Sequence, residues 1–392
     1  MAPATVSRWA RRYVLVSALS LLSWQLAALV GVPRLTEMFL ALFGFVLHMV
    51  FGKAYSLVPS YFARTVAFPR APAVQFPLVV LGTGSLVGAS LQFGPSWLEP
   101  VGALLWSLGV IVFLGTLFWT LRTNLTGRET ATGETNVDRR PVDRTANGFV
   151  PVALLYLAVG SYETLAIATS LPPLLDGYFP RVTHLIAAGT AGLLIFALGF
   201  RLLPRFLVAH PPRRLVVLVL ATGAVGPSLL AVHLWNAPWF YLGALLETVA
   251  VVGFALGYGL LFVRSDRRRV GFYGVLAGAL CGVVAAALGV GFAIGHSASS
   301  AVLAHLRLNL LGFLGLSIVG IAYQFYPPAI GTLPGASNRT AFVSIGALAG
   351  GLFGQTVGLV GGVPAATTLG ELSTLVGAAL YLFLLAAVFQ TR

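Results

Sequence analysis

The sequence predicts an all-α integral membrane protein with about twelve transmembrane helices, arranged as three repeats of four. Three observations predict this fold. The 392-residue chain is 58% hydrophobic and only 9% charged, which is outside the range of soluble domains. Its apolar runs have the length of about 20 residues that a helix needs to cross a bilayer. One pattern of glycine, aromatic residue and proline also recurs three times along the chain.

The apolar runs place the predicted spans, which together form a single membrane domain over residues 1–392. The spans are roughly 13–31, 38–59, 73–92, 100–121, 149–170, 183–204, 215–234, 239–263, 270–294, 303–327, 341–361 and 368–389. Eleven or thirteen spans are the alternatives, because the seventh run is short and several loops contain proline. The first run follows a basic start, as in a signal peptide. No small-residue cleavage site follows it, so we expect an uncleaved first span.

The basic residues between the spans predict the orientation. With the N-terminus inside, the inner segments hold nineteen arginines and the outer loops hold only two, Arg34 and Arg181. Lysine and arginine concentrate on the cytoplasmic side of membrane proteins, so both termini are expected in the cytoplasm. This distribution accounts for the formal net charge of +13. Because no nucleic-acid-binding motif accompanies the charge, the lipid bilayer and not a nucleic acid is the expected partner.

The segment 122–147 is the longest polar connection. It is rich in glycine, threonine and charge and has no apolar face, so we expect a flexible cytoplasmic linker. Substitution of Gly127 within it is expected to have little effect. The single cysteine, Cys281, lies in an apolar run. A single cysteine excludes an internal disulfide and a cysteine-based metal cluster.

The second, sixth and tenth spans share one spacing pattern. Pro327 is preceded by tyrosine at −4 and by glycine at −7 and −15, and Pro59 has the same residues at the same offsets. Pro204 has phenylalanine, alanine and glycine there. Each of these spans also contains a histidine. The pattern divides the chain into repeats of roughly 13–121, 149–263 and 270–389, with histidines His48, His184 and His305.

Glycines at every fourth position predict further close contacts between helices, because small residues let backbones approach. On the eleventh span they are Gly346, Gly350, Gly354, Gly358 and Gly362, and on the ninth span they are Gly274, Gly278 and Gly282. We therefore expect that leucine in place of Gly350 or Gly354 lowers the yield of folded protein.

The histidines of the repeated spans are candidate metal ligands, because imidazole is a common ligand of heme iron and of copper. In the predicted orientation His184 and His305 lie about one turn from the outer surface, and His48 lies nearer the middle of the membrane. A helix histidine that is only hydrogen-bonded is the alternative for each. The other histidines are expected to be structural; they are His210, His233 and His296.

Ionisable residues inside the spans are the second group of candidates, because the bilayer makes them costly. Glu163 and Glu247 lie in the middle of the fifth and eighth spans. We expect a buried functional role for both, such as the relay of a proton. Lys53 and Arg201 lie towards the inner ends of their spans, and for them snorkelling of the side chain to the membrane surface is favoured.

The segment from His305 to Pro327, HLRLNLLGFLGLSIVGIAYQFYP, resembles helix ten of the heme-copper oxidase subunit I superfamily. It is most similar to the branch that contains the C-type oxidases, the nitric oxide reductases and the NnrS membrane proteins. His48, with Pro59 eleven residues later, resembles helix two. The resemblance covers the whole chain by topology and two helices by motif. It implies twelve helices in three arcs of four and a protein of a prokaryotic plasma membrane.

The resemblance implies roles for individual residues. In the superfamily the helix-two histidine and the second histidine of a His-x-His pair bind a low-spin heme, and the first histidine of the pair binds a high-spin heme. His48 and His305 match two of these positions, whereas Arg307 stands at the third. Arginine cannot bind iron because it stays protonated, but it can pair with a heme propionate, with Glu37 or with a lipid phosphate. His184 matches the helix-six metal ligand by helix alone, and copper is not expected because the seventh span lacks a histidine pair.

The resemblance therefore implies a heme-linked protein with an eroded metal centre. Such a protein would bind, sense or handle a diatomic gas such as O2 or NO, or a metal, and would not be a complete oxidase or reductase. Two alternatives stay open. One is a permease for copper, heme or a small solute on the same fold. The other is a structural subunit, with partner membrane subunits, of a respiratory or nitrosative-stress complex.

Overall fold

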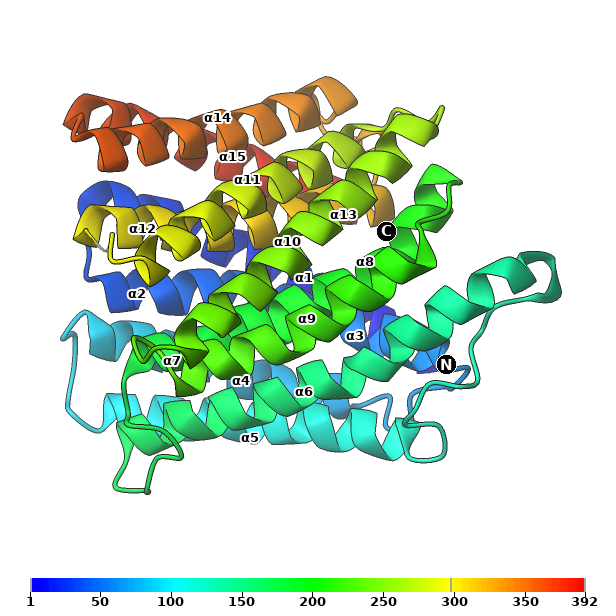
Figure 1. Cartoon of the computed structure of the whole chain (residues 1–392), viewed down its shortest axis with the longest axis horizontal. Helices are drawn as coiled ribbons and strands as arrows, with labels where there is room; N and C mark the ends of the chain where they lie inside the picture. Colours follow the sequence, from blue (N-terminus) through cyan, green and yellow to red (C-terminus); the bar gives the residue numbers. More distant parts are fainter. Residues whose placement is uncertain (1, 297, 391–392) are drawn as a thin grey trace.

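The computed structural model describes residues 2–296 and 298–390. Every regular element in this part of the chain is a helix, and twelve stretches are long and apolar enough to cross a bilayer, as predicted. The helices run roughly parallel to the long axis of the molecule, and α1 begins and α15 ends at the same end of the bundle (Figure 1). We name this the terminal end and the opposite one the distal end.

Nine of the twelve spans in the described residues are single helices that form the outer part of the bundle. They are α1 (Ala2–Val30), α4 (Ala71–Ser90), α5 (Leu98–Leu121), α6 (Arg140–Ala168), α9 (Arg213–Val232), α10 (Trp239–Arg264), α11 (Val270–Ala293), α14 (Asn338–Gly361) and α15 (Pro364–Gln390). At most half of the most apolar stretch of each is buried. Large apolar side chains such as Ile111, Phe353 and Leu369 are exposed on them, which suits contact with lipid.

The other three spans lie at the centre, and each consists of an α-helix, a π-helical segment and a second α-helix. They are α2 (Arg34–Met38), η1 (Phe39–Leu47) and α3 (His48–Tyr61); α7 (Phe179–Thr183), η3 (His184–Gly192) and α8 (Leu193–Leu207); and α12 (Ser299–Arg307), η4 (Leu308–Leu316) and α13 (Ser317–Phe325). In these spans 83%, 78% and 72% of the most apolar stretch is buried. All three run from the distal towards the terminal end (Figure 1). The three histidine spans are therefore the core of the bundle, and π-helical segments are often found at functional sites.

Glycine determines how closely each central span approaches an outer helix. The glycines fifteen residues before the three prolines each pack against the first helix of the same predicted repeat. A Cβ atom added to them would lie 2.8 Å from Ser20 Cβ of α1 (Gly44), 2.5 Å from Tyr156 Cγ of α6 (Gly189) and 2.5 Å from Cys281 Cβ of α11 (Gly312). The same contact thus recurs with a period of four spans. The threefold repeat itself stays a prediction.

The glycines of α11 pack as predicted, whereas in the predicted α14 series only Gly354 and Gly358 face α15. A Cβ atom on Gly354 would lie 3.4 Å from the Cα atom of Gly370, and one on Gly358 would overlap Thr367. Cβ atoms on Gly274, Gly278 and Gly282 would lie 3.1, 2.8 and 2.9 Å from atoms of Gly320, Ser317 and Phe313. A Cβ atom on Gly346 or Gly350 of α14 meets nothing within 4 Å. On Gly351 it would lie 2.6 Å from the carbonyl oxygen of Gly370 in α15. The prediction that Gly350 faces a helix contact is therefore wrong, because the contact lies one residue further along.

Alanine at Gly351 is expected to lower the free energy of unfolding by about 1–3 kcal/mol, because the added methyl group overlaps the backbone of α15. Alanine at the adjacent Gly350 is expected to stay within about 0.5 kcal/mol of the wild type, because its side chain points into open space. The two variants change helix propensity equally, so each controls for the other. Thermal unfolding of the purified variants in detergent measures the difference. Equal losses would contradict this packing of α14 on α15.

The segment 122–147 is not the flexible linker that the sequence predicts. Its second half is helical: a 3-10 helix, η2, spans Glu134–Arg139, and α6 begins at Arg140. The side-chain amide of Asn124 donates a hydrogen bond of 3.0 Å to the carbonyl oxygen of Phe62, so the first half is tied to the end of α3. Its polar composition reflects hydrogen bonds to the bundle and not the absence of structure.

Gly127 in this segment is constrained, which contradicts the expectation that it tolerates substitution. Its φ is +64°, and a Cβ atom would lie 2.2 Å from Asn147 Cβ. Only glycine adopts this conformation without cost and leaves this space free. Nearby, Arg64 and Glu129 form an ion pair of 2.6 Å outside the membrane spans, and the hydrogen bond from Arg64 lowers the pKa of Glu129.

Candidate functional site

The three central histidines are held in the same way. In each ring Nδ1 lies within hydrogen-bonding distance of a backbone carbonyl oxygen. The distances are 2.7 Å from His48 to Phe43, 2.8 Å from His184 to Pro180 and 2.9 Å from His305 to Ala285. Because a carbonyl oxygen can only accept, Nδ1 carries the proton and Nε2 of the neutral ring keeps its lone pair. Metal-binding histidines are commonly anchored in this way through the second ring nitrogen.

His48 lies in a closely packed aromatic environment. Its side chain is fully buried, and in the described part of the chain its Nε2 has no hydrogen-bond partner. The ring centroids of Tyr13 and Phe51 lie 6.1 and 6.4 Å from that of His48. A buried nitrogen without a partner is costly, so this atom is available to a ligand. A heme bound to it would have to displace the surrounding rings, so the site fits a small ligand better than a macrocycle.

His184 and His305 lie near each other in the distal half, close enough for the charge of one to act on the other. Both side chains are partly buried. The amide nitrogen of Asn309 lies 3.2 Å from His305 Nε2, and the ring centroid of Phe292 lies 5.3 Å from that of His305. Among the described residues no three His, Cys, Asp or Glu side chains form a metal-binding group, so His48 does not join this pair. A neutral imidazole of this kind would fit as a ligand of a heme iron.

The Arg307 side chain is bound by residues of three other helices. Its guanidinium is only 4% exposed. Nη1 donates to Glu371 Oε1 at 2.8 Å and to Gln355 Oε1 at 3.1 Å, and Nη2 donates to the two carboxylate oxygens of Glu37 at 3.2 and 3.3 Å. The sequence analysis considered a heme propionate, Glu37 and a lipid phosphate as partners of Arg307, and Glu37 is confirmed. Glu371 and Gln355 were missed.

These residues form the centre of a distal charge cluster, which also contains Trp24 and Thr374. The Trp24 indole donates to Glu37 Oε2 at 3.1 Å, and the Gln355 amide donates to Thr374 at 2.9 Å. The cluster therefore joins α1, α2, α12, α14 and α15. Charges inside a membrane protein persist only when they are paired and hydrogen-bonded, so this network holds the five helices in register. Glu371 and Gln355 could have been found as polar residues inside apolar spans.

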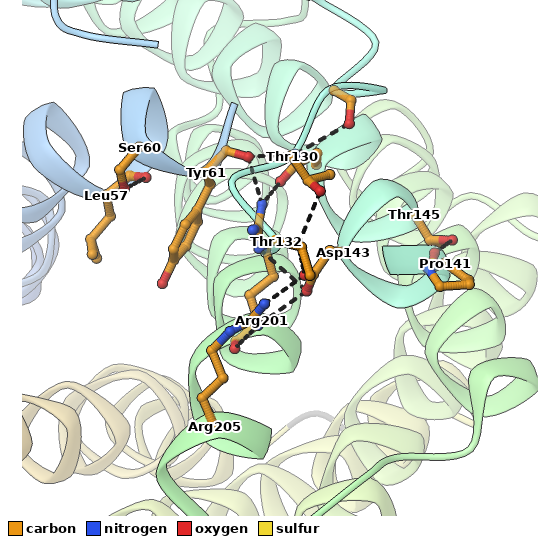
Figure 2. A network of polar contacts seen from close by, with 12 residues as sticks. Leu57, Ser60, Tyr61, Thr130, Thr132, Pro141, Asp143, Thr145, Arg201 and Arg205 are labelled. Atoms are coloured by element: carbon orange, nitrogen blue, oxygen red, sulfur yellow. Dashed lines mark hydrogen bonds and ion pairs between the residues drawn. The ribbon is translucent and has the colours of Figure 1, made fainter. Parts of the chain in front are cut away.

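A second network, the terminal charge cluster, lies at the other end of the bundle. Figure 2 shows its side chains from close by. Asp143 of α6 is 1% exposed and forms ion pairs with Arg205 at 2.6 Å and with Arg201 at 3.5 Å. Arg201 also donates to the carbonyl oxygen of Tyr61 at 2.8 Å and to the Asn147 side chain, and it lies 4.1 Å over the Tyr61 ring. The prediction that Arg201 snorkels is wrong: its side chain is 2% exposed. Its partner lies in the segment that was expected to be a linker.

Lys53 of α3 is held by aromatic side chains of the tenth span. Its Nζ lies 3.8 Å from the centroid of the Phe325 ring and 3.3 Å from the Tyr326 hydroxyl. The side chain lines a cavity of about 90 Å³ between the three central spans. Every other residue that lines the cavity is apolar or glycine. The ammonium group is thus stabilised inside the bundle by cation–π contacts, and no lipid-facing position is needed to explain it.

The two mid-span glutamates have different environments. Glu163 of α6 is 1% exposed, and its Oε1 accepts hydrogen bonds from the backbone nitrogens of Leu174 at 2.6 Å and Leu175 at 3.3 Å. It therefore holds the loop between α6 and α7, which is a structural role. Glu247 of α10 is partly buried, and its buried Oε2 has no hydrogen-bond partner in the described part of the chain.

Fold and site together define a class: a twelve-span helical membrane protein with anchored histidines on its central spans and a charge cluster near each end. The sequence matches no protein-family model and no curated protein at a significant level. The likeness to the heme-copper oxidase superfamily therefore rests on the motifs of the second and tenth spans, and it stays a hypothesis.

Proposed function

We propose that the protein binds heme in the distal half of the bundle and uses it to bind or sense a diatomic gas. The observation that supports this function is the shared state of the central histidines, whose Nδ1 atoms are bonded to carbonyl oxygens. That state leaves Nε2 as the ligand atom, and at His305 an iron would take the place of the Asn309 amide on Nε2. We assign the iron ligand to His305, with His184 beside it, and not to His48. When bound, the heme would supply an iron atom with an open position for O2 or NO.

The surrounding residues support binding without the turnover of an oxidase or reductase. Arg307 occupies the position of a low-spin heme ligand, and its two terminal nitrogens bind Glu37, Glu371 and Gln355. Hence the second heme of the superfamily has no ligand pair here. His305 and Asn309 are adjacent on one face of the tenth span, so the Asn309 amide can orient a ligand next to His305.

We also propose that the terminal end faces the cytoplasm of a prokaryotic cell and the distal end faces outside. The distribution of arginine supports this orientation, because the loops at the terminal end carry nearly all of these residues. The loop between α10 and α11 alone contains Arg267, Arg268 and Arg269. In this orientation His184 and His305 lie in the outer half of the membrane.

Heme titration tests the function. Purified protein supplemented with heme is expected to show a Soret band that shifts when carbon monoxide or nitric oxide is added, as a high-spin iron with an open position does. His305→Ala should abolish the band, and His184→Ala should change it. His48→Ala is the matched control, because His48 has the same Nδ1 anchor but lies apart, and it should leave the band nearly unchanged. Wild-type protein that binds no heme would contradict the proposal.

A second candidate function, a permease for a small solute, is favoured by the cavity between the central spans. Its walls are apolar, and Lys53 places one positive charge in them. Intramembrane charges commonly mark the path of a substrate. The heme titration separates the two functions. A permease for a small solute binds no heme, so the protein would show no Soret band. Lys53→Met would then be expected to impair transport of the solute.

A further inference from the structure

The Glu247 carboxyl group faces α9 at a point where the two helices are in direct contact. A Cβ atom on Gly226 of α9 would lie 2.8 Å from Glu247 Oε2 and 3.0 Å from its backbone nitrogen. Oε2 is buried, and no hydrogen-bond donor reaches it from the described residues. None of the ion pairs found in that part of the chain includes Glu247.

This environment determines the charge of the carboxyl group. An ionised carboxylate without a donor or a cation costs several kcal/mol inside a membrane protein, so such a group keeps its proton. The other intramembrane carboxylates have partners. Glu163 accepts two backbone N–H groups at Oε1, although its Oε2 has no partner among the described residues, and Glu37 and Glu371 bind Arg307. Glu247 therefore differs from them because neither a cation nor a hydrogen-bond donor among the described residues stabilises its ionised form.

The helix that faces this carboxyl is interrupted at the same level. Pro227 in α9 has no N–H group, so it leaves the carbonyl oxygen of Gly223 without its usual helical donor. The Tyr156 hydroxyl of α6 donates to the carbonyl oxygen of Ala224 at 2.7 Å and accepts from the Ser228 N–H at 3.1 Å. A proline and an inserted side chain are two causes of helix bending. The carboxyl thus lies beside the part of α9 that can most readily move.

The remaining neighbours provide no compensating charge. Tyr156 is the titratable group that interacts electrostatically with Glu247. The sequence of α9 from Gly223 to Leu230 contains no titratable side chain, and neither does the second half of α11, residues 282–293. We propose that Glu247 is a proton-binding site, separate from the histidines, which holds its proton while α9 packs against it and exchanges it when α9 moves away at Pro227. This proposal does not depend on heme binding.

A carbodiimide that partitions into the membrane tests the site. Dicyclohexylcarbodiimide adds to a carboxylic acid: the acid proton goes to one nitrogen, the carboxyl oxygen bonds to the central carbon, and no group leaves. At neutral pH we expect an adduct on Glu247 of the wild type, mapped by peptide mass spectrometry, and less of it at alkaline pH. Glu247→Gln should lose the adduct. Glu163→Gln, which removes the other mid-span glutamate, should keep it.

Infrared spectroscopy gives a second measurement that does not depend on access of the reagent. The wild type should show the carbonyl stretch of a protonated carboxylic acid; Glu247→Gln should lose this band and Glu163→Gln should retain it. A band of equal strength in Glu247→Gln would show that another carboxyl group holds the proton and would overturn the proposal. Wild-type protein with neither band nor adduct would show that Glu247 is ionised, with the same consequence. If Glu247→Gln does not fold, the mapped adduct in the wild type decides.

Discussion

Methionine in place of Arg307 is expected to lower the free energy of unfolding by about 3–5 kcal/mol, because breaking a buried ion pair leaves an uncompensated charge. Two carboxylates, Glu37 and Glu371, would lose their cation while 5% and 10% exposed, respectively. We expect little folded protein after purification, measured by size-exclusion chromatography and thermal unfolding in detergent. Histidine at this position, which restores the pattern of the superfamily, should destabilise the protein for the same reason and should not create a heme site.

The control for this prediction removes the charges together. The triple variant Arg307→Met, Glu37→Gln and Glu371→Gln leaves no buried charge in the distal cluster, so it should recover much of the stability lost in Arg307→Met. Additive losses from the three substitutions would contradict the network. Arg307→Lys keeps the charge but not the geometry of a guanidinium, which reaches both carboxylates at once, so we expect an intermediate stability.

The fold could be predicted from the sequence because it depends on local quantities. The length of an apolar run determines whether a helix crosses the bilayer, and all twelve predicted spans are helices in the structure. The three spans that share the spacing before Pro59, Pro204 and Pro327 are also the most buried ones in the structure. Burial follows from that spacing because glycines at matching positions admit a close neighbour.

The partners of the buried charges could not be predicted in the same way. Arg307 and Glu371 lie 64 residues apart in the sequence, and Arg307 and Glu37 lie 270 residues apart. The sequence around each residue does not show which spans become neighbours in the fold. The same limit explains the error at Gly350 in α14, because a row of glycines at every fourth residue does not show which of its members face a neighbouring helix. Only the position of α15 determines which face is packed.

The segment 122–147 shows a further limit. Its composition is typical of a flexible linker, yet Asp143 within it is almost fully buried. An acidic residue near the end of a predicted span can be recognised as part of an ion pair only when a buried arginine is known to need a counter-charge. Arg201 supplies that signal: a charged residue inside an apolar span requires a counter-charge. For a charged residue inside a span, an ion pair with an opposite charge near the same membrane interface is therefore a better prediction than snorkelling of the side chain.

Leucine in place of Asp143 is expected to lower the free energy of unfolding by about 3–5 kcal/mol, because it leaves the buried Arg201 guanidinium without its carboxylate. Arg201 would keep its hydrogen bonds to the Tyr61 carbonyl oxygen and to Asn147, which offset part of the loss but carry no charge. Thermal unfolding in detergent measures the change. Arg205→Gln removes the other cation from the same carboxylate and is the matched control. Its side chain is 33% exposed and screened by water, so we expect a clearly smaller loss.

The double variant Asp143→Leu, Arg201→Leu separates the ion pair from packing. With both charges removed, neither side chain leaves a buried charge behind, so the combined loss should be smaller than the sum of the single losses. Equal stability of Asp143→Leu and Arg205→Gln would instead show that Asp143 serves mainly the exposed arginine. In that case Arg201 would be held by the carbonyl oxygen at the end of α3, where the negative end of the helix dipole attracts a cation.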